Sequence, residues 1–471
     1  TVAVESCMTS EVRFIADSSW RRPEHGNVVL AGSPLTLFSL SQSGQTIAEC
    51  IERANPLPQG HEPLTERLLN AGAIHPIPSV DDKARFSLNT VTAVIPAYIQ
   101  TPQEAQTLKS LVASCSALHS TVVIDDCSPH PLPDLGETRV IRLEKNSGPA
   151  AARNAGIATV ETDFIACIDV DVTISATTIS QLLPYFADDK VALVAPRVKS
   201  RATANSVGEY EVAASVLDMG DAEARVSAGT RVSYVPSAMW LCRTTALQSV
   251  SCFDDSLRSG EDVDLVWRLN NAGWVCRYQP QAVCSHVPRA TLQQFIQQRM
   301  SYGESAAPLA KRHPGKLAPV KLNVWQASTW LFVALGMPFV ALGVAIVAGA
   351  STAKKLRKFP QLKSESINIS VHGTAKSGLS VAHAIGRVWW PIALVLAIFS
   401  QRLRLIFVAA ALAPAVYEWW TKRPHLDVVR FALMKMLDNA SYGAGVWKGV
   451  VVTRNAAPLI PTVKLTAANE E

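Results

Sequence analysis

The chain has 471 residues, of which 48% are hydrophobic and 18% are charged, and its formal net charge is +5. This length predicts more than one domain, and the composition predicts globular domains with large cores, which excludes a disordered chain. The mild positive charge argues against a nucleic-acid-binding protein, and the basic residues near 311–321 and 354–363 indicate local contact with phosphate or lipid. Nine cysteines without a C-x-x-C pair favour a reducing compartment and cysteines that fill the core.

The first 80 residues predict a small N-terminal domain. Residues 1–26 are polar and predict a loose lead-in, and the domain itself spans 27–80. Its regular segments are two β-like runs at 27–30 and 35–40, followed by helical spacing at 45–54 and 64–71. This order fits a winged-helix fold and resembles the PqqD-like peptide-recognition domains. The alternative is a docking module without a ligand. The polar segment 76–89, with two prolines, predicts a linker.

The segment 90–320 predicts a larger α/β domain. Its predicted strands are 91–96, 121–124, 140–143 and 164–168. The helix after the first strand has a clear start, because Thr101, Pro102 and Glu104 have the spacing of a capping box with proline in the first turn. Strand, helix and strand within about 35 residues form a βαβ unit, which predicts a parallel sheet.

Polar residues follow these strands in the places where parallel sheets bind ligands. Asp169 and Asp171 come directly after the strand 164–168, and a D-x-D pair there can bind a divalent cation that bridges the phosphates of a nucleotide. The alternative is a pair of solvated aspartates in a turn. The strand 121–124 is likewise followed by Asp125 and Asp126.

A glycine turn at 145–148 precedes a helix that we expect to begin at Pro149. A helix N-terminus preceded by glycine, here Gly148, favours anions because its N–H groups and its dipole face the ligand. Arg153 lies about one turn into the helix and is in reach of the same phosphate, or else is a surface arginine without a ligand.

Five motifs then occur in one order: IPAY at 95–98, IDDCS at 124–128, NSGPAAARNAGI at 146–157, DVD at 169–171 and FDDSLRSGEDVDLVWRL at 253–269. In this order they resemble the family 2 GT-A glycosyltransferases. The whole chain, with its N-terminal unit and C-terminal apolar segments, most resembles the mycofactocin-system glycosyltransferases. One departure is Cys127, which stands where this family usually has glycine and requires a slightly different backbone.

The resemblance implies a nucleoside-diphosphate-sugar donor and a divalent metal ion. The donor-binding residues that it implies are Pro96, Tyr98, Asp125, Asp126, Gly148, Arg153 and Asp169. Asp125 or Asp126 would accept from a pyrimidine N–H and Asp169 from the ribose hydroxyls. Asp171 would bind Mg²⁺ or Mn²⁺, with His286 as a further ligand or as a structural histidine.

The same resemblance implies that Asp262, with Glu261 beside it, deprotonates the acceptor hydroxyl in a single displacement that inverts the anomeric centre. The spacing of Ser259 and Asp262 also fits a capping box, in which Asp262 only stabilises the following helix. At that helix N-terminus we expect the pKa of Asp262 to be lowered.

The resemblance further implies transfer of glucose from UDP-glucose, in β linkage, onto a ribosomal-peptide-derived precursor of mycofactocin. One alternative is a membrane-associated polysaccharide or lipid-linked-sugar transferase, although those processive enzymes typically carry Q-x-x-R-W and the chain has only Gln298-Arg299-Met300 without a tryptophan. An alternative of another class is a peptide-binding scaffold with an inactive transferase domain, against which the retained DVD and ED sequences argue.

Apolar segments in 321–420 predict association with a membrane, followed by a tail at 421–471. Trp330–Ala350 is mostly apolar and long enough to span, Ser380–Ser400 is a second candidate and Leu405–Tyr417 a shorter third. A single crossing would place the basic residues 354–358 outside the cell, against the positive-inside tendency, because a nucleotide-sugar site stays in the cytosol. We therefore expect a re-entrant or in-plane hairpin at the cell membrane, with the catalytic domain on the cytoplasmic side. The alternative is a buried helical hairpin of a soluble protein.

Overall fold

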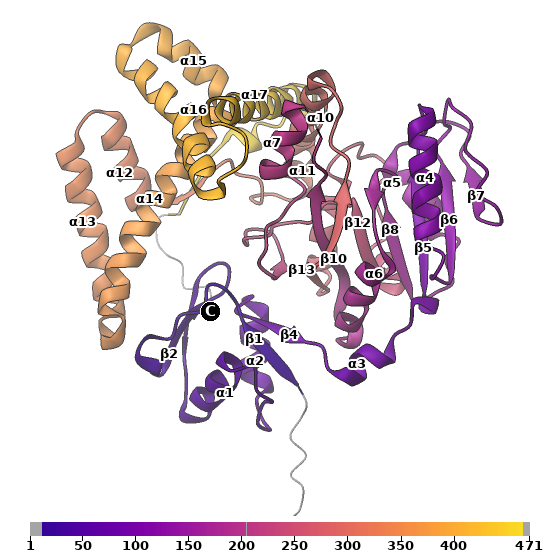
Figure 1. Cartoon of the computed structure of the whole chain (residues 1–471). Helices are drawn as coiled ribbons and strands as arrows, with labels where there is room; N and C mark the ends of the chain where they lie inside the picture. The colour runs from indigo at the N-terminus through magenta and orange to yellow at the C-terminus, as the bar shows by residue number, and fades with distance from the viewer. Residues whose placement is uncertain (1–11, 204, 465–471) are drawn as a thin grey trace, which may run out of the picture. The chain divides into compact units, whose positions relative to one another are not determined.

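The computed structural model describes residues 12–203 and 205–464, which fall into two compact units (Figure 1). The first unit contains the chain up to Arg201 together with Ser215–Val287. The second contains Ala202–Ala214 and the chain from Pro288 onwards. The first unit holds both the N-terminal domain and a large sheet, and the second consists mainly of helices.

The N-terminal domain has its own hydrophobic core. Its elements are β1 Arg13–Ala16, η1 Pro23–His25, β2 Val28–Ala31, β3 Thr36–Ser39, α1 Gln42–Glu52, α2 Glu62–Asn70 and β4 Ile74–Ile77. The predicted order of two strands and two helices is thus confirmed: β2 and β3 pair antiparallel, and Ser41 caps α1. Phe38, Ile51 and Leu68 are buried in one cluster, which holds the helices on the strands.

Two predictions at the edges of this domain are wrong. The expected loose lead-in contains β1, which pairs antiparallel with β4 so that Arg13 lies opposite Ile77. The expected linker 76–89 contains the end of β4, the helix α3 Val80–Arg85 and the 3-10 turn η2 Leu88–Thr90. Ser79 and Asp82 form a capping box at α3. The pairing of β1 with β4 joins residues about 60 positions apart, which local patterning does not reveal. Residues 1–11 of the lead-in lie outside the described residues.

The rest of the first unit is built on a nine-stranded mixed sheet. Its strands are β5 Val91–Ala97, β6 Ser120–Asp125, β7 Arg139–Arg142, β8 Phe164–Ile168, β9 Val172–Thr173, β10 Val191–Ser200, β11 Ala224–Val226, β12 Met239–Arg243 and β13 Val275–His286. The order is β11-β13-β10-β12-β8-β5-β6-β7, with β9 paired to β13. Neighbours β8, β5, β6 and β7 are parallel, as are β10 and β13, whereas β12 is antiparallel to both of its neighbours. The carboxyl ends of β5, β6, β8, β10 and β13 therefore meet at one edge.

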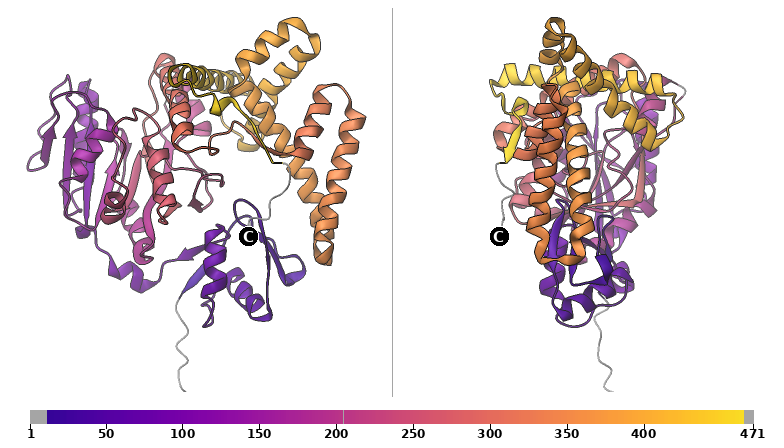
Figure 2. Two further views of the ribbon diagram at one scale, coloured as in Figure 1. Left: turned by 180° about the vertical axis from the view of Figure 1, so that it is seen from behind. Right: turned by 90° about the vertical axis from the view of Figure 1, so that its left-hand side faces the viewer.

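Helices cover both faces of this sheet (Figure 2). They are α4 Pro102–Ser114, α5 Pro149–Ile157, α6 Ala176–Leu182, the 3-10 turn η3 Leu183–Ala187, α8 Thr244–Ser249 and α9 Glu261–Asn271. Alternate residues of β6 point to opposite faces: Val123 shares a cluster with Leu108 of α4, and Val122 shares one with Ala152 of α5. The predicted capping box of Thr101 and Glu104 at α4 is confirmed.

The second unit is helical. Its elements are α7 Ser206–Ala214, α10 Leu292–Glu304, α11 Ala306–Arg312, β14 Lys321–Asn323, α12 Val324–Ala334, α13 Pro338–Lys355, η4 Leu356–Lys358, η5 Pro360–Leu362, α14 Lys363–Arg387, α15 Trp390–Phe399, α16 Gln401–Lys422, α17 Val428–Thr453, η6 Ala457–Leu459 and β15 Thr462–Lys464. The expected tail 421–471 thus contains the 26-residue helix α17. It lies so close to α10 that a Cβ on Gly445 would be 2.0 Å from the carbonyl oxygen of Met300. Buried Arg299, which forms ion pairs with Glu211 and Asp438, ties α10 to α7 and α17.

Among the described residues, α13 and α16 are long and apolar enough to cross a membrane, and a third crossing results if α14 and α15, which meet at 87°, form one bent span. The predicted continuous segment Trp330–Ala350 is broken, because Gly336 adopts a left-handed conformation (φ 72°) and Pro338 begins a new helix. Ser380–Ser400 is broken between α14 and α15, and Leu405–Tyr417 lies inside the longer α16. The helices α12 and α13 run side by side in Figures 1 and 2.

Candidate active site

The carboxyl edge of the sheet brings the predicted acidic residues together. Asp125 is the last residue of β6, Asp169 follows β8, and His286 ends β13. The direction of the strands alone would place these residues at one edge. Electrostatic interactions among Asp169, Asp171, Glu261 and Arg153 show that the D-x-D pair and the start of α9 share one site.

Arg153 is the centre of this site. Its side chain is only 2% exposed, and its guanidinium donates to Asp169 at 2.6 Å and to Glu261 at 3.0 Å. The guanidinium also lies 5.3 Å from the ring centre of Phe253. Burial lowers the pKa of Arg153, but the two carboxylates outweigh it and raise this pKa above its usual range. Arg153 is therefore a fixed buried cation between α5, β8 and α9, and its contact with phosphate stays a prediction.

Asp169 is half-buried, and its environment raises the pKa of its carboxyl, which favours the protonated form. Burial raises the pKa of its carboxyl to about 6, with the charge of Asp171 adding to this and that of Arg153 opposing it. A cation or a ribose hydroxyl at this carboxylate would favour its ionised form.

Asp171 and His286, the two predicted metal ligands, lie side by side, and their role as ligands stays a prediction. His286 Nε2 lies 3.1 Å from Asp171 Oδ2, and the two residues are brought together because β9 pairs with the end of β13. The 3.1 Å spacing is that of a hydrogen bond between the imidazole and the carboxylate. It also matches the distance of about 3 Å between neighbouring ligands of an octahedral Mg²⁺ with bonds of about 2.1 Å. Within the described residues no group of three His, Cys, Asp or Glu side chains is arranged for a metal. The remaining ligands would come from a diphosphate and water, as is usual for Mg²⁺.

Asp125 and Asp126 are both buried and both bound to backbone amides. Asp125 accepts from the amide of Ser128 at 2.9 Å and from Arg142. Asp126 accepts from Ser147 at 2.6 Å and from Gly148 at 2.8 Å, and so holds the turn before α5. These contacts explain why both carboxylates are buried, and recognition of a pyrimidine by either one stays a prediction.

Gly148 is the N-cap of α5, with φ at 91°, and Pro149 begins the helix as predicted. The left-handed backbone at Gly148 favours glycine. Arg258 packs against this glycine and donates to Asn146 at 3.2 Å, so it adds a positive charge beside the turn. Arg258 and Arg142 were not among the predicted site residues, because each belongs to the site through a long-range contact. Pro96 is half-buried in β5, and Tyr98, just beyond it, is 39% exposed.

Cys127 adopts a left-handed backbone with φ at 59°. This conformation favours glycine and costs an L-residue about 1–2 kcal/mol. Its thiol contacts the carbonyl of Glu144 at 3.7 Å. The turn after β6 therefore keeps a glycine-like backbone although it carries a cysteine.

Asp262 is the second residue of α9 and differs from its predicted surroundings in two ways. The N-cap is Gly260, in a left-handed conformation, and not Ser259, so the expected capping box is absent and Asp262 Oδ1 accepts from the amide of Val263 at 2.8 Å. The pKa of Asp262 is raised to about 7, and not lowered, because burial and the charge of Glu261 outweigh the backbone amides and Arg153. A carboxylate with this pKa is well suited to accept a proton near neutral pH.

Comparisons with known proteins agree with this geometry. Residues 92–250 match the family model described as Glycosyl transferase family 2. The fold, a mixed and mostly parallel GT-A-like sheet with acidic residues at its carboxyl edge, is that of a glycosyltransferase.

The chain is 36% identical over 456 residues to the pre-mycofactocin glycosyltransferase of Mycobacterium tuberculosis, with 93% of this chain and 95% of the relative covered. It therefore belongs to the family of that enzyme, within glycosyl transferase family 2. It is also 22% identical over 46% of its length to poly-beta-1,6-N-acetyl-D-glucosamine synthase of Staphylococcus aureus, of which 54% is covered. One similar solved structure is the mannosyltransferase PcManGT of Pyrobaculum calidifontis, in complex with GDP-Man and Mn²⁺. The alignment covers 71% of this chain and 88% of the PcManGT chain, with 17% sequence identity and a TM-score of 0.37.

Proposed function

We propose that this glycosyltransferase moves glucose from UDP-glucose onto pre-mycofactocin or a closely related peptide-derived acceptor, with inversion to a β linkage. The acceptor is suggested by the pre-mycofactocin glycosyltransferase with which the chain is 36% identical. The observation that carries the chemistry is Asp262, a carboxylate with a pKa near 7 beside the buried Arg153–Glu261 pair.

The donor would bind at the carboxyl edge of the sheet. Asp171 and His286 would hold a Mg²⁺ or Mn²⁺ ion, which supplies positive charge to the departing diphosphate. Gly148 at the start of α5 supplies amide groups that favour a phosphate. Asp169 would accept from the ribose, while Arg153 orients its carboxylate from the buried side at 2.6 Å.

The proposed reaction is a single displacement with Asp262 as the base. The acceptor oxygen attacks the anomeric carbon, the bond between that carbon and the diphosphate breaks, and the hydroxyl proton passes to Asp262. Because one displacement occurs on the face opposite the leaving group, the anomeric configuration inverts. Arg153 fixes Glu261 on the side of α9 next to Asp262, and Glu261 in turn keeps the pKa of Asp262 high.

The N-terminal domain would recognise the peptide part of the acceptor, by its resemblance to PqqD-like domains. It is joined to the rest of its unit by Asp17, whose buried carboxylate accepts from His75 and from Arg231, each at 2.9 Å. If this role is correct, removal of residues 12–78 weakens acceptor binding and leaves slow hydrolysis of the donor intact. Unchanged acceptor affinity after deletion would refute it.

The apolar helices would attach the protein to the cytoplasmic face of the cell membrane. Phe339 of α13 and Phe399 of α15 are 87% and 80% exposed, which is costly in water and favourable in lipid. The basic residues that follow α13 would then lie near anionic headgroups.

Mass spectrometry of purified enzyme tests the proposal directly. Incubation with UDP-glucose and pre-mycofactocin should add hexose units to the acceptor, whereas GDP-mannose should not. The chief rival, a polysaccharide synthase, is suggested by the similarity to the Staphylococcus aureus enzyme over part of the chain. Polymer formed from UDP-N-acetylglucosamine without a peptide-derived acceptor would support that rival and refute the proposed acceptor.

A further inference from the structure

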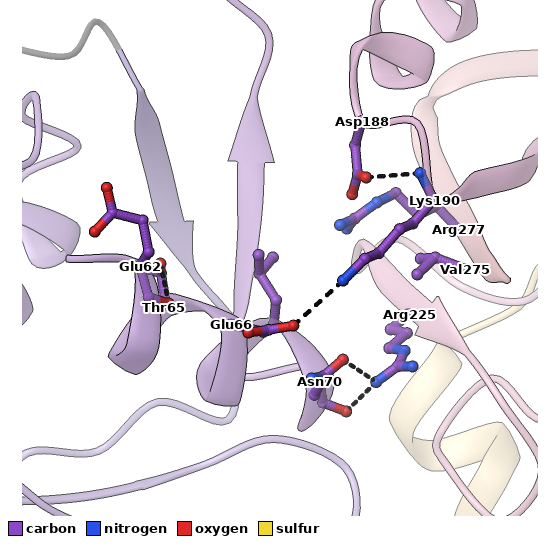
Figure 3. Close-up of a pocket in the computed structure, with 10 residues that line it drawn as sticks. Glu62, Thr65, Glu66, Asn70, Asp188, Lys190, Arg225, Val275 and Arg277 are labelled. Carbon is purple, nitrogen blue, oxygen red and sulfur yellow. Dashed lines mark hydrogen bonds and ion pairs between the residues drawn. The ribbon is translucent and has the colours of Figure 1, made fainter. Parts of the chain in front are cut away.

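A cavity of about 320 Å³ lies between helix α2 and the amino ends of β10 and β13 (Figure 3). Its lining residues are Glu62, Thr65, Glu66, Leu69 and Asn70 from α2, Asp188 and Lys190 from the turn before β10, and Arg225, Val275 and Arg277 from the sheet. Val275 begins and His286 ends β13, and the paired strand β10 covers the same length from Val191 to Ser200, which places the two residues on the order of 30 Å apart. The cavity is therefore separate from the candidate active site.

Arg277 is the unusual residue of this cavity. It is only 4% exposed, and its Nε is buried without a hydrogen-bond partner. Within the described part of the chain, its guanidinium forms neither a hydrogen bond nor an ion pair. A buried charge without a hydrogen-bonded partner is costly, and an external anion bound to the guanidinium would lower that cost.

Arg225 brings a second positive charge close to Arg277. It lies directly opposite Arg277 in the antiparallel pair of β11 and β13, and like charges in such a pair repel each other. Arg225 donates to Asn70, but its Nε is also buried without a partner. Lys190 adds a third positive charge to the wall, and it reaches Glu66 at 3.3 Å.

The nearby acidic residues do not supply the missing partner. Glu223 and Asp188 act on Arg277 through their charges, but no ion pair with either is formed among the described residues. Burial raises the pKa of Glu223, which favours its neutral form. Glu66 is already bound to Lys190. The lining thus holds three carboxylates and three basic side chains, but among the described residues none of these carboxylates forms an ion pair with either arginine.

We propose that this cavity binds an oxyanion, a carboxylate or a phosphate group, held by Arg277 and Arg225. Guanidinium groups bind both kinds of oxyanion through paired N–H donors, and two adjacent arginines would share one such group. Because α2 forms the opposite wall, the bound anion would also stabilise the packing of the N-terminal domain on the sheet. The site does not depend on the proposed sugar transfer.

Isothermal titration calorimetry on the full chain tests this site, with sodium phosphate, sodium succinate and sodium chloride at matched ionic strength. Arg277→Gln should weaken the binding of the preferred oxyanion about tenfold or more, because it removes a charged hydrogen-bond donor. The matched control is Arg139→Gln, which removes the same charge from an exposed position on β7, at the far edge of the sheet. This control should bind as the wild type does.

The titrations also distinguish the source of the anion. Binding of phosphate alone identifies a phosphate site, and binding of succinate alone identifies a carboxylate site. A purely structural arginine predicts a different pattern: Arg277→Gln would lower the melting temperature and leave anion binding unchanged. We expect instead that, without added anion, this variant melts at or above the wild-type temperature, because an unpartnered buried charge is removed. Equal dissociation constants for wild type and Arg277→Gln, or no binding of either oxyanion, would overturn the proposal.

Discussion

Replacing Asp262 with asparagine separates a catalytic base from a residue that only stabilises helix α9. The substitution keeps the size of the side chain and an oxygen that can accept from the amide of Val263, so the contact at 2.8 Å is retained. Since Gly260 caps the helix without a side-chain bond, little capping energy is at stake. General-base catalysis contributes about 10²–10⁴ in rate, and we expect a loss of this size in turnover.

The pH dependence supplies a second measurement on the same variant. Burial and Glu261 raise the pKa of Asp262 to about 7, and only the ionised form accepts a proton. Wild-type turnover should therefore rise with pH through about 7, and one unit below that pKa about a tenth of the base is ionised. Because the folded state favours the protonated carboxyl, the free energy of unfolding falls as the pH rises from about 4 to about 7. At pH 8 this loss is complete, and Asp262→Asn should melt at or above the wild-type temperature.

The assay measures hexose transfer to the acceptor by mass spectrometry, with donor binding measured by calorimetry. Asp189→Asn is the matched control, because this aspartate side chain is 88% exposed. Near-wild-type transfer by Asp262→Asn, with an unchanged pH profile, would refute the reasoning. The neighbouring carboxylates would be poor substitutes, since Glu261 is bound to Arg153 and fully buried Asp264 is bound to Arg268 at 2.7 Å.

Three further predictions follow from the same structure. Glu261→Gln weakens the buried pair with Arg153, so urea unfolding should show that the free energy of unfolding falls by about 1–3 kcal/mol. The acid limb of the pH profile of turnover should also move to lower pH, because the charge that raises the pKa of Asp262 is lost. An unshifted limb would contradict this. EDTA should abolish transfer and Mn²⁺ should restore it, with Asp171→Asn requiring more Mn²⁺; full activity in chelator would exclude the metal role. Exchange of exposed Phe339 and Phe399 for serine should move protein from the membrane to the soluble fraction, and a wild-type chain found only in the soluble fraction would refute membrane attachment.

Local sequence signals determined the catalytic fold to a large extent. The strand Phe164–Ile168, the capping box at Thr101 and the start of α5 at Pro149 all appear where the pattern predicts them. Each depends on neighbours within a few residues, such as a run of β-branched and apolar side chains or a proline in a first turn. The edge at which Asp169 and His286 meet follows from the direction of parallel strands.

Only the tertiary structure decided the charge states of the buried side chains and the pairing of strands that are distant in the sequence. The raised pKa of Asp262 arises from burial and from the charge of Glu261, which outweigh the opposing charge of Arg153. Arg153 and Glu261 themselves meet across 108 positions of the chain. The strand β1 exists because β4 pairs with it, and Arg277 and Arg225 are neighbours because β11 pairs with β13. Sequence patterns record local preference, whereas burial and pairing between distant segments depend on the complete fold, and these set the charge states at both sites.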